Sequence, residues 1–522
     1  MRSKWLVALL AAALVLSLMA GCAKKQPAEA PKPPPEKILV FARGSDSVSL
    51  DPAMIVDGES AKVCNNIYDN LVRYKADSTE VEPALAESWE SPDGIVWTFH
   101  LRKNVKFHDG TPFNAQAVKF NIDRQAPDVR VPDMAYADFT LGMIDKVEVI
   151  DDYTIRFTLK YPYAPFLLNL AMGLSAPICS PTAIQKYGAD YGMHPVGTGP
   201  FIFERWDKEQ QIVLKANPEW WGGKPKVDKL VFKVTKENAV RANELLAGEI
   251  DMMDGVDPND VQRIQADPNV KLIQAPGMNI NYMGFRVFKP PFNNQKVRQA
   301  VSMAIDRKTL VEHLYQGNSL LANGPLPPCL WGYVPELKPY DYDPEGAKAL
   351  LAEAGYPNGF TMDLLCYPNP RGYNPVGGER LGEAIQADLA KVGIKVNLVS
   401  KAWKEHLAAC AGTDGHAYLI GWMGDNGDPD NFLYILLHGS QSEGMNYSHY
   451  ANPQVDDLLT KAQQTSNADE RLALYKQAQE IIVRDAPWVF ISHAMDMVAM
   501  RKNVTGFKIH PTSSIFLWNV DK

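Results

Sequence analysis

The sequence is poor in cysteine and lacks the short motifs that carry common hydrolytic or nucleotide-dependent chemistry. Its six cysteines include no Cys-x-x-Cys pair, which argues against a zinc site and a thioredoxin-like redox site. We find no Gly-x-Ser-x-Gly, His-Glu-x-x-His or Ser-x-x-Lys motif, and no glycine stands five places before Gly223-Lys224 to complete a phosphate-binding loop. Nothing in the sequence supports catalysis, and neither a metal nor a cofactor is expected.

The sequence also lacks an excess of positive charge and a long internal apolar run. The formal net charge is −8 at pH 7 and becomes −10 if residues 1–21, which include Arg2 and Lys4, are removed. This argues against nucleic acid or an anionic membrane surface as a partner. The body from about Ile38 to Lys522 is expected to be globular and soluble, and its length predicts two or three domains.

The N-terminus has the pattern of an export signal. A positive start is followed by an almost unbroken apolar stretch from Trp5 to Leu18, which is shorter than the roughly 20 residues that cross a bilayer. Its ending, Leu18 to Cys22, resembles a bacterial lipoprotein cleavage site. That resemblance implies removal of residues 1–21 and lipidation of Cys22; two or more acyl chains would anchor the chain without spanning the membrane. A signal that is uncleaved or soluble on export is the alternative.

A proline-rich segment follows the lipidation site. Residues 22–37 cannot bury a core, and their prolines favour an extended tether of about 3 Å per residue.

Five cysteines remain after Cys22, and their odd number leaves at least one thiol unpaired within the chain. Their pairing cannot be read from the sequence; we expect them mostly to be buried as small apolar side chains: Cys64, Cys179, Cys329, Cys366 and Cys410.

The body alternates predicted strands and helices, so the fold class is α/β with antiparallel additions. Alternating apolar residues predict strands at 38–42, 97–101 and 394–399, and a hairpin with arms 147–150 and 153–159. Helical spacing and capping residues predict helices that begin near Ser60 and after Asp343, and one through 381–389 that Gly393 closes. In a late helix we expect the core-facing positions to be Leu472, Tyr475, Gln479 and Ile482.

One acidic, glycine-rich turn follows an apolar strand-like run at 417–420. It reads GWMGDNGDPDNF over residues 421–432, and a carboxylate on such a turn is well placed to meet a cationic ligand. Asp425, Asp428 and Asp430 could equally be solvated turn formers. An EF-hand is excluded because the twelfth position from Asp425 is Leu436 and not glutamate.

Five further motifs, in order along the chain, resemble the extracellular solute-binding proteins of peptide and nickel ABC transporters, family 5. They are LAESW at 85–89 with WTFHLRKNVKFHDGTPF at 97–113, VGTGPF at 196–201, NPEWWGGKP at 217–225, VRQAVSMAIDR at 297–307 and LLAEAGYP at 350–357. Some of these residues also have structural uses. Asp109-Gly110 is typical of a hairpin turn, and Trp220 with Trp221 is better explained as a packed aromatic corner than as a ligand platform.

The resemblance implies a two-lobed clamp of the periplasmic-binding-protein type, class II, with an extra subdomain inserted in the first lobe. Lobe 1 would contain residues 38–278 and 493–522, with the insertion at about 72–187, and lobe 2 residues 279–492. Two hinge crossings are expected, near Pro276 to Gly284 and near Trp488 to Met500. Ligand would bind between the lobes and shift the population toward the closed form.

Within the family, the turn at 421–432 resembles the dipeptide-binding branch, which implies that Asp425 pairs with the α-amino group of a peptide. The segment YPNPRGYNP at 367–375 resembles the loop of that branch whose arginine holds the peptide carboxylate, which implies this role for Arg371. The loop has Gly372 where the branch usually has proline, which leaves peptide length and side-chain preference open. Further ligand contacts expected here are Trp422, Gly424, Asn426, Trp403 and Tyr373, with lobe core as the alternative for the two tryptophans.

The sequence therefore predicts a lipid-anchored, extracytoplasmic receptor that is not an enzyme. It would bind dipeptides or short oligopeptides as a monomer and deliver them to an ABC permease with its ATPase subunits, in the cell membrane or in a periplasm. Haem, a nickel chelate, glutathione or an oligosaccharide are alternative solutes for the same role, and a secreted lipid-anchored hydrolase is the rival class.

Overall fold

The computed structural model describes residues 36–522, which include the whole body from Ile38 to Lys522. The predicted signal segment, Cys22 and nearly all of the tether lie outside the described residues. Within the described part of the chain, no helix is both long and apolar enough to cross a membrane. Below, lobe 1 and lobe 2 denote the ranges predicted above.

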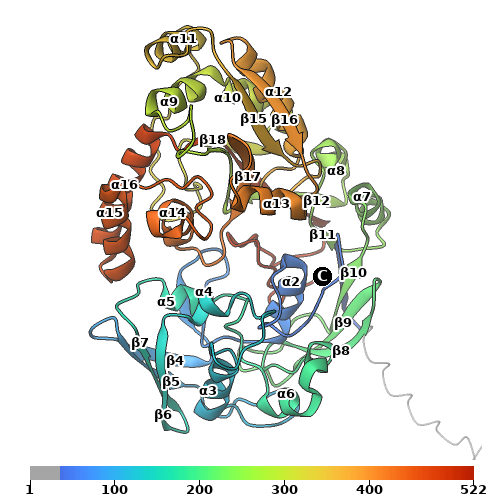
Figure 1. Ribbon diagram of the computed structural model, residues 1–522. Helices are drawn as coiled ribbons and strands as arrows, with labels where there is room; N and C mark the ends of the chain where they lie inside the picture. The colour runs from blue at the N-terminus through green and yellow to red at the C-terminus, as the bar shows by residue number, and fades with distance from the viewer. Residues whose placement is uncertain (1–35) are drawn as a thin grey trace, which may run out of the picture. The chain divides into compact units, whose positions relative to one another are not determined.

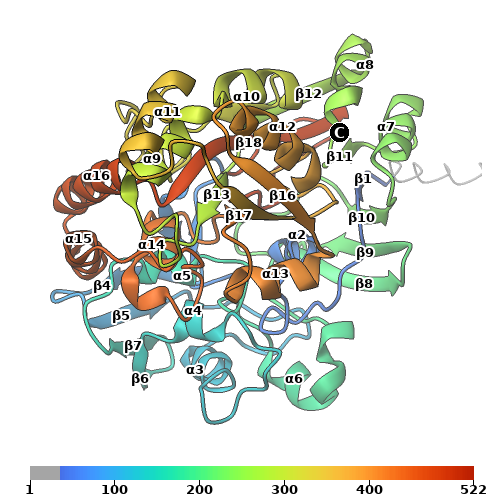
Figure 2. The ribbon, with the colours of Figure 1, turned by 45° about the horizontal axis from the view of Figure 1, so that its top comes forward.

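Among the described residues, twelve strands form one mixed sheet that runs through the body (Figures 1 and 2). Ten of them follow the order β16 (Lys395–Ser400), β15 (Thr361–Cys366), β17 (Ala417–Met423), β13 (Asn279–Phe285), β18 (Trp488–Arg501), β11 (Met252–Met253), β1 (Ile38–Arg43), β10 (Lys229–Val234), β9 (Gln211–Ala216) and β8 (Phe201–Asp207). Two more, β12 (Val270–Pro276) and β14 (Ser319–Leu321), pair with β18 off this path.

Strand β18 is shared by both halves of the sheet. Its first residues pair with β13 of lobe 2, as in Trp488 opposite Gly284, and its last seven pair with β12 of lobe 1, as in Arg501 opposite Val270. Both chain stretches that were expected to cross between the lobes are therefore strands of this sheet.

Two smaller sheets lie in the segment predicted as an insertion. One is four-stranded, in the order β4 (Ala86–Glu90), β5 (Val96–Leu101), β7 (Thr154–Leu159) and β6 (Ile144–Asp151). The other is the short pair β2 (Val72–Tyr74) and β3 (Val81–Pro83). In Figure 1 the four-stranded sheet lies at the opposite end of the body from α11 (Pro344–Glu353).

Helices cover the sheets on both sides of β18. In lobe 1 they are α2 (Gly58–Ile67), α3 (Ala115–Asp123), α4 (Ala137–Leu141), α5 (Phe166–Leu170), α6 (Pro181–Tyr187), η1 (Gly188–Met193), α7 (Asn238–Ala247), η2 (Pro258–Asp260) and α8 (Val261–Ala266). In lobe 2 they are α9 (Gln295–Ala304), α10 (Arg307–Tyr315), α11, α12 (Gly378–Ala390), α13 (Trp403–Ala411), α14 (Asp430–Leu437), η3 (Gly439–Gln441), α15 (Pro453–Gln464) and α16 (Ala468–Asp485).

The buried apolar residues form clusters that respect the same division of the chain. Three clusters draw on residues between 39 and 270, and two of these also include residues between 498 and 520. Two others draw on residues between 278 and 491. The fold is thus a mixed α/β body with separate cores on the two sides of the shared strand, as the resemblance implied.

Most of the local predictions are confirmed. Asp343 caps α11 by accepting the N–H of Gly346 at 2.8 Å, and the hairpin of β6 and β7 forms where its two arms were expected. The indoles of Trp220 and Trp221 both donate to the buried carboxylate of Asp69, which is the packed corner that the sequence predicted.

Two local predictions are wrong. Helix α2 is capped by Asp57, whose Oδ1 accepts the N–H of Ser60 at 2.8 Å, so Ser60 lies inside the helix and not at its start. Leu472 is 45% exposed and does not face the core. The position one residue earlier, Arg471, is buried instead, because its guanidinium reaches the carboxylate of Asp428.

Candidate functional site

The turn between β17 and α14 is built from consecutive side-chain-to-backbone hydrogen bonds. Oδ1 of Asn426 accepts the N–H of Asp428, and Oδ1 of Asp428 accepts the N–H of Asp430, both at 2.9 Å. Gly427 supplies the positive φ of +75° that lies between them. The spacing of short polar residues in this segment therefore folds it locally, as Asx turns do.

Gly424 lets this turn pack closely against lobe 1 residue Met278. A Cβ at this position would lie 2.7 Å from Cε2 of Phe432 and 2.8 Å from Cγ of Met278. The N–H of Gly424 donates to the carbonyl of Met278 at 2.7 Å. The glycine predicted as a ligand contact thus has a steric role in the turn.

Asp425 is partly buried and is held by neutral groups. The hydroxyl of Tyr136 donates to its Oδ1 and Nδ2 of Asn431 to its Oδ2, each at 3.1 Å. Oδ1 of Asn431 in turn accepts the N–H of Asp425 and the indole N–H of Trp422. Burial raises the pKa of Asp425 to about 6. Among residues 36–522 no lysine or arginine forms an ion pair with this carboxylate, so its charge has no cationic partner there.

Asp428 and Asp430 build the turn, as one of the alternatives above predicted, but they are buried and not solvated. Both are buried, and Asp428 forms an ion pair with Arg471 at 2.8 Å and accepts the hydroxyl of Tyr475 at 3.2 Å. Asp430 accepts Nε2 of Gln463 at 3.1 Å, and burial next to Asp428 raises its pKa. These contacts fix the turn to α15 and α16.

Arg371 stands on the loop between β15 and α12. Its guanidinium carbon lies 3.7 Å from the centroid of the Trp403 ring, a distance at which the cation and the ring attract each other. Nε of Arg371 has no hydrogen-bond partner, and no carboxylate among the described residues pairs with the guanidinium. Arg371, which was predicted to hold a carboxylate, is therefore oriented by the Trp403 ring, and no acidic side chain among the described residues neutralises its charge.

A cavity of about 680 Å³ lies against this loop and between the two lobes. Lobe 2 contributes Arg371, Gly372 and Met423, and the shared strand β18 contributes residues 494–498. Lobe 1 contributes Lys62, which pairs with both Glu59 and Asp254. The volume is in the range of roughly 300–1,000 Å³ that small-ligand pockets occupy.

The structure brings only part of the predicted site onto the wall of this cavity. Asp425 follows the lining residue Met423 by two positions but does not line the cavity itself. Asn426 is buried, and its Nδ2 donates to Oδ1 of Asn169 in lobe 1 at 2.7 Å. Tyr373 is buried in the lobe 2 core against Gly421, so neither side chain faces the cavity.

The two tryptophans have mixed surroundings. Trp403 packs against both lobe 2 cores while its face supports Arg371, and Trp422 packs at the edge of one core and donates to Asn431.

Sequence reasoning missed Tyr136 and Asn431 as partners of Asp425. Asn431 lies within the same motif, six residues on, and could have been found there; Tyr136 has no sequence signal.

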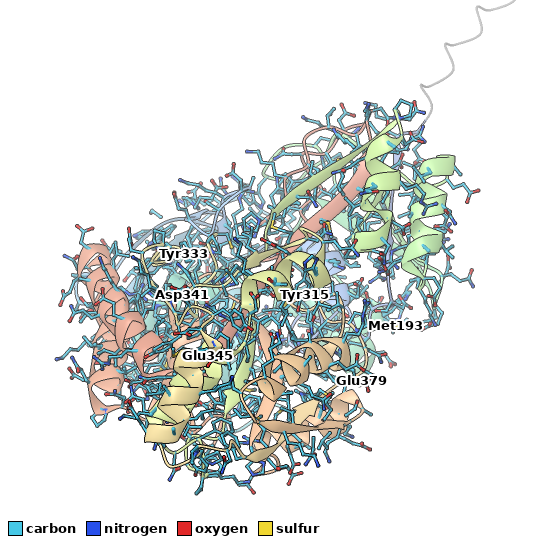
Figure 3. The ribbon with its side chains drawn as sticks, turned by 90° about the horizontal axis from the view of Figure 1, so that it is seen from above. Met193, Tyr315, Tyr333, Asp341, Glu345 and Glu379 are labelled. Carbon is cyan, nitrogen blue, oxygen red and sulfur yellow. The ribbon has the colours of Figure 1, made fainter. Side chains whose placement is uncertain are left out.

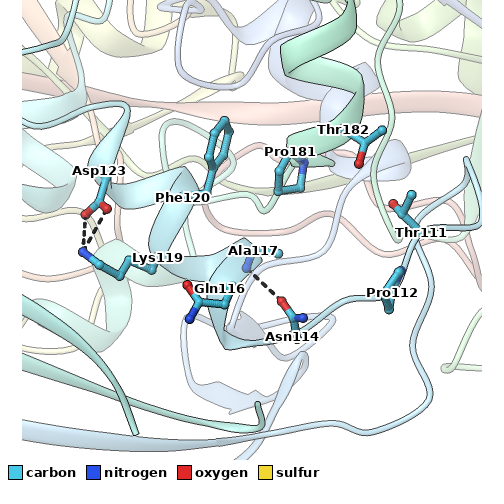
Figure 4. Close-up of a pocket in the computed structure, with 10 residues that line it drawn as sticks. All are labelled: Thr111, Pro112, Asn114, Gln116, Ala117, Lys119, Phe120, Asp123, Pro181 and Thr182. Carbon is cyan, nitrogen blue, oxygen red and sulfur yellow. Dashed lines mark hydrogen bonds and ion pairs between the residues drawn. The ribbon is translucent and has the colours of Figure 1, made fainter. Parts of the chain in front are cut away.

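A separate groove of about 490 Å³ lies on lobe 1 along α3 (Figure 4). Its cation, Lys119, is already paired with Asp123 at 2.8 Å, and the other lining groups include hydroxyls, amides and the ring of Phe120. The groove offers no charge without a partner. The cavity at Arg371 is therefore the better candidate for a charged ligand.

Metal and thiol chemistry have little support within residues 36–522. No group of three or more His, Cys, Asp or Glu side chains there could hold a metal ion. The five cysteines predicted as small apolar side chains are free thiols, and all except Cys329 are buried. Burial raises the pKa of the Cys410 thiol to about 12, which keeps it protonated.

Comparisons with known proteins bear on the family and the fold. Residues 80–444 match the family described as bacterial extracellular solute-binding proteins, family 5 Middle. The chain is 37% identical to Heme-binding protein A of Haemophilus influenzae, over 98% of this chain and 97% of that protein. It is also 37% identical to the Dipeptide-binding protein of Escherichia coli, over 93% and 94%.

A solved structure also resembles the fold. The periplasmic binding protein DppA of Helicobacter pylori, in complex with the peptide STSA, superposes with a TM-score of 0.77 and 37% identity over 92% of this chain and 97% of that one.

Proposed function

The chain belongs to the bacterial extracellular solute-binding proteins of family 5, and we propose that it is the substrate-binding subunit of an ABC importer that captures dipeptides or short oligopeptides. Proteins of this family bind solutes for transporters and are not enzymes. The permease and its ATPase subunits would supply the pathway and the energy.

One observation carries the peptide proposal. An arginine without an acidic partner lines the cavity, and a carboxylate without a cationic partner stands in the adjacent turn. A short peptide is a zwitterion whose carboxylate would pair with Arg371 and whose ammonium would pair with Asp425. The planar fork of arginine suits a carboxylate because it can donate to both oxygens.

The approach of Tyr136 to Asp425 is consistent with this role. Its hydroxyl comes from lobe 1, whereas Asp425 belongs to lobe 2, so the carboxylate lies where the two lobes meet. An ammonium group bound there would contact both lobes. A ligand favours closure only if it contacts both lobes of the closed form better than it contacts the open one.

The relatives support the same solute class and leave one alternative to test. The Escherichia coli relative is named for dipeptides and the Helicobacter pylori structure holds a peptide, whereas the Haemophilus influenzae relative is named for haem. The chain is equally identical in sequence, at 37%, to the haem-named and the dipeptide-named relative, so haem is the second candidate solute.

We also propose the finer organisation that the sequence predicted. The lobe boundaries 38–278 with 493–522, and 279–492, are supported by the hydrophobic clusters, which divide the chain at nearly the same places. Lipidation of Cys22 and retention outside the cytoplasm, at the cell membrane or in a periplasm, are supported by the signal pattern. The monomeric state that was predicted from the sequence is part of the same proposal.

The decisive experiment is calorimetry on the chain from residue 23 onward with dipeptides, longer peptides and haem. Dipeptide affinity should fall by two or more orders of magnitude in Asp425→Asn, since leaving one member of a desolvated charge pair alone costs about 3–5 kcal/mol. Asp457→Asn, at an exposed helix position in the same lobe, is the matched control. Unchanged affinity in Asp425→Asn would refute the amine role, and binding of haem alone would refute the peptide proposal.

A further inference from the structure

The backbone of Arg371 is fixed by one residue of its own loop. Arg371 and Asn374 exchange both of their backbone hydrogen bonds, with N···O distances of 2.9 and 2.8 Å, and so form an isolated β-bridge. Only Gly372 and Tyr373 lie between them. A displacement of Asn374 would therefore displace the backbone from which the guanidinium projects.

The side chain of Asn374 is locked from both ends inside lobe 2. It is 0% exposed; its Oδ1 accepts the hydroxyl of Tyr315 and its Nδ2 donates to the hydroxyl oxygen of Tyr367, each at 3.1 Å. Tyr315, at the end of α10 (Figure 3), accepts in turn Nδ2 of Asn281 on β13 at 2.9 Å. This chain of hydrogen bonds is surrounded by apolar core, where each unmade bond is costly.

The same network reaches the ring that supports the guanidinium. Tyr367, which accepts from Asn374, packs edge-on against Trp403 with ring centroids 5.3 Å apart. Trp403 carries Arg371 on its face. The backbone of Arg371 and the surface under its guanidinium are thus set by one buried cluster, and no acid among residues 36–522 holds the guanidinium in their place.

We propose that Asn374 is a positioning residue that aims Arg371 at the ligand carboxylate and so determines the preference for ligands with a free carboxylate end. This inference rests on the proposed function for the identity of the ligand. It assigns to Asn374 no contact with the ligand. Binding sites need their contacting groups held by such supporting bonds, because a charged group that is free to turn loses affinity and selectivity.

The test compares a free dipeptide with its C-terminal amide, which lacks the carboxylate. Asn374→Ala should weaken the free dipeptide about tenfold or more, the loss expected when a hydrogen bond to a charged group is misaligned. Affinity for the amide should change less than about twofold, so the selectivity between the two ligands collapses. Equal weakening of both ligands, or of neither, would overturn the proposal, because a purely structural residue has no reason to distinguish them.

Two additions keep the test decisive. Tyr315→Phe removes the hydrogen bond to Oδ1 of Asn374, together with the acceptor of Nδ2 of Asn281, and leaves the side chain of Asn374 in place. It should shift selectivity in the same direction, and it replaces Asn374→Ala in the test if that variant folds poorly. Asn397→Ala, at an exposed position of β16, is the control and should leave selectivity unchanged. If the wild-type protein binds no dipeptide, the proposed function fails. The present inference is then decided by the rate at which phenylglyoxal modifies Arg371, followed by mass spectrometry: faster in Asn374→Ala supports it, and an unchanged rate overturns it.

Discussion

The ion pair of Arg471 and Asp428 should be the main anchor of the turn that carries Asp425. The carboxylate is 0% exposed and receives one guanidinium nitrogen at 2.8 and 2.9 Å, while Nε of Arg471 donates to the carbonyl of Ala462 at 2.8 Å. Arg471→Met keeps an unbranched apolar stem in place and removes these donors. The free energy of unfolding should fall by about 3–5 kcal/mol, the usual cost of leaving one member of a buried pair without its partner.

The magnitude follows from what would remain around Asp428. Its carboxylate would keep the hydroxyl of Tyr475 at 3.2 Å and the N–H of Asp430 at 2.9 Å, and neither group carries a charge. Asp428→Asn in the Arg471→Met background removes the stranded charge and retains an acceptor for Asp430. The double variant should therefore be more stable than Arg471→Met alone, which a double-mutant cycle measures directly.

Urea unfolding of the intact chain, followed by circular dichroism, provides the measurement. Arg484→Met is the matched control because it lies in the same helix with its side chain 61% exposed, where an ion pair contributes about 0–1 kcal/mol. If Arg471→Met destabilises the protein no more than Arg484→Met, the reasoning that the buried pair anchors the turn is refuted. The reasoning is also refuted if the double variant is less stable than either single variant.

Four further predictions concern the candidate site. Burial raises the pKa of Asp425 to about 6, so the negative charge that attracts an ammonium group is lost as the pH falls through 6. Dipeptide affinity measured by calorimetry should therefore drop between pH 7 and pH 5. An affinity that does not change with pH would contradict this. The stability of the ligand-free protein should respond with the opposite sign, since a raised carboxyl pKa makes stability fall as the pH rises from about 4 to 6. Gly424→Ala places a Cβ 2.7 Å from Phe432 and should cost about 1–3 kcal/mol in urea unfolding, whereas Gly58→Ala, with open space at the Cβ position, should not. Arg371→Lys keeps the charge but loses the planar group stacked on the indole, so affinity for peptides with a free carboxylate should fall about tenfold; an unchanged affinity would show that charge alone suffices.

The sequence predicted the local elements well because their signals are local. The Asp343 cap, the alternation in 97–101 and the hairpin at 147–159 each depend on residues a few positions apart, and all three are found in the structure. The errors came where a distant contact outweighed a local pattern. Leu472 continues an apolar helical spacing, yet the helix turns Arg471 inward because Asp428, 43 residues earlier, needs its charge.

The candidate site divides in the same way. Motifs were enough to single out Asp425 and Arg371, and the structure gives both side chains the unpaired charge that a zwitterionic ligand requires. The same reasoning placed Tyr373 and Asn426 among the ligand contacts, whereas the tertiary structure buries both. A motif shows which residues are neighbours in the sequence, but it does not show toward which face of the loop each side chain points.

The sequence by itself determined the family, the α/β class and the two charges of the proposed ligand site, because each is carried by short, ordered motifs. Only the tertiary structure decided what surrounds those charges. Tyr136 meets Asp425 across 289 positions of sequence, and Asn374 is held by Tyr315 across 59. Such pairs form only when the chain has folded, and the pair of Tyr136 and Asp425 also requires the two lobes to meet, so no periodicity or spacing in the sequence encodes them.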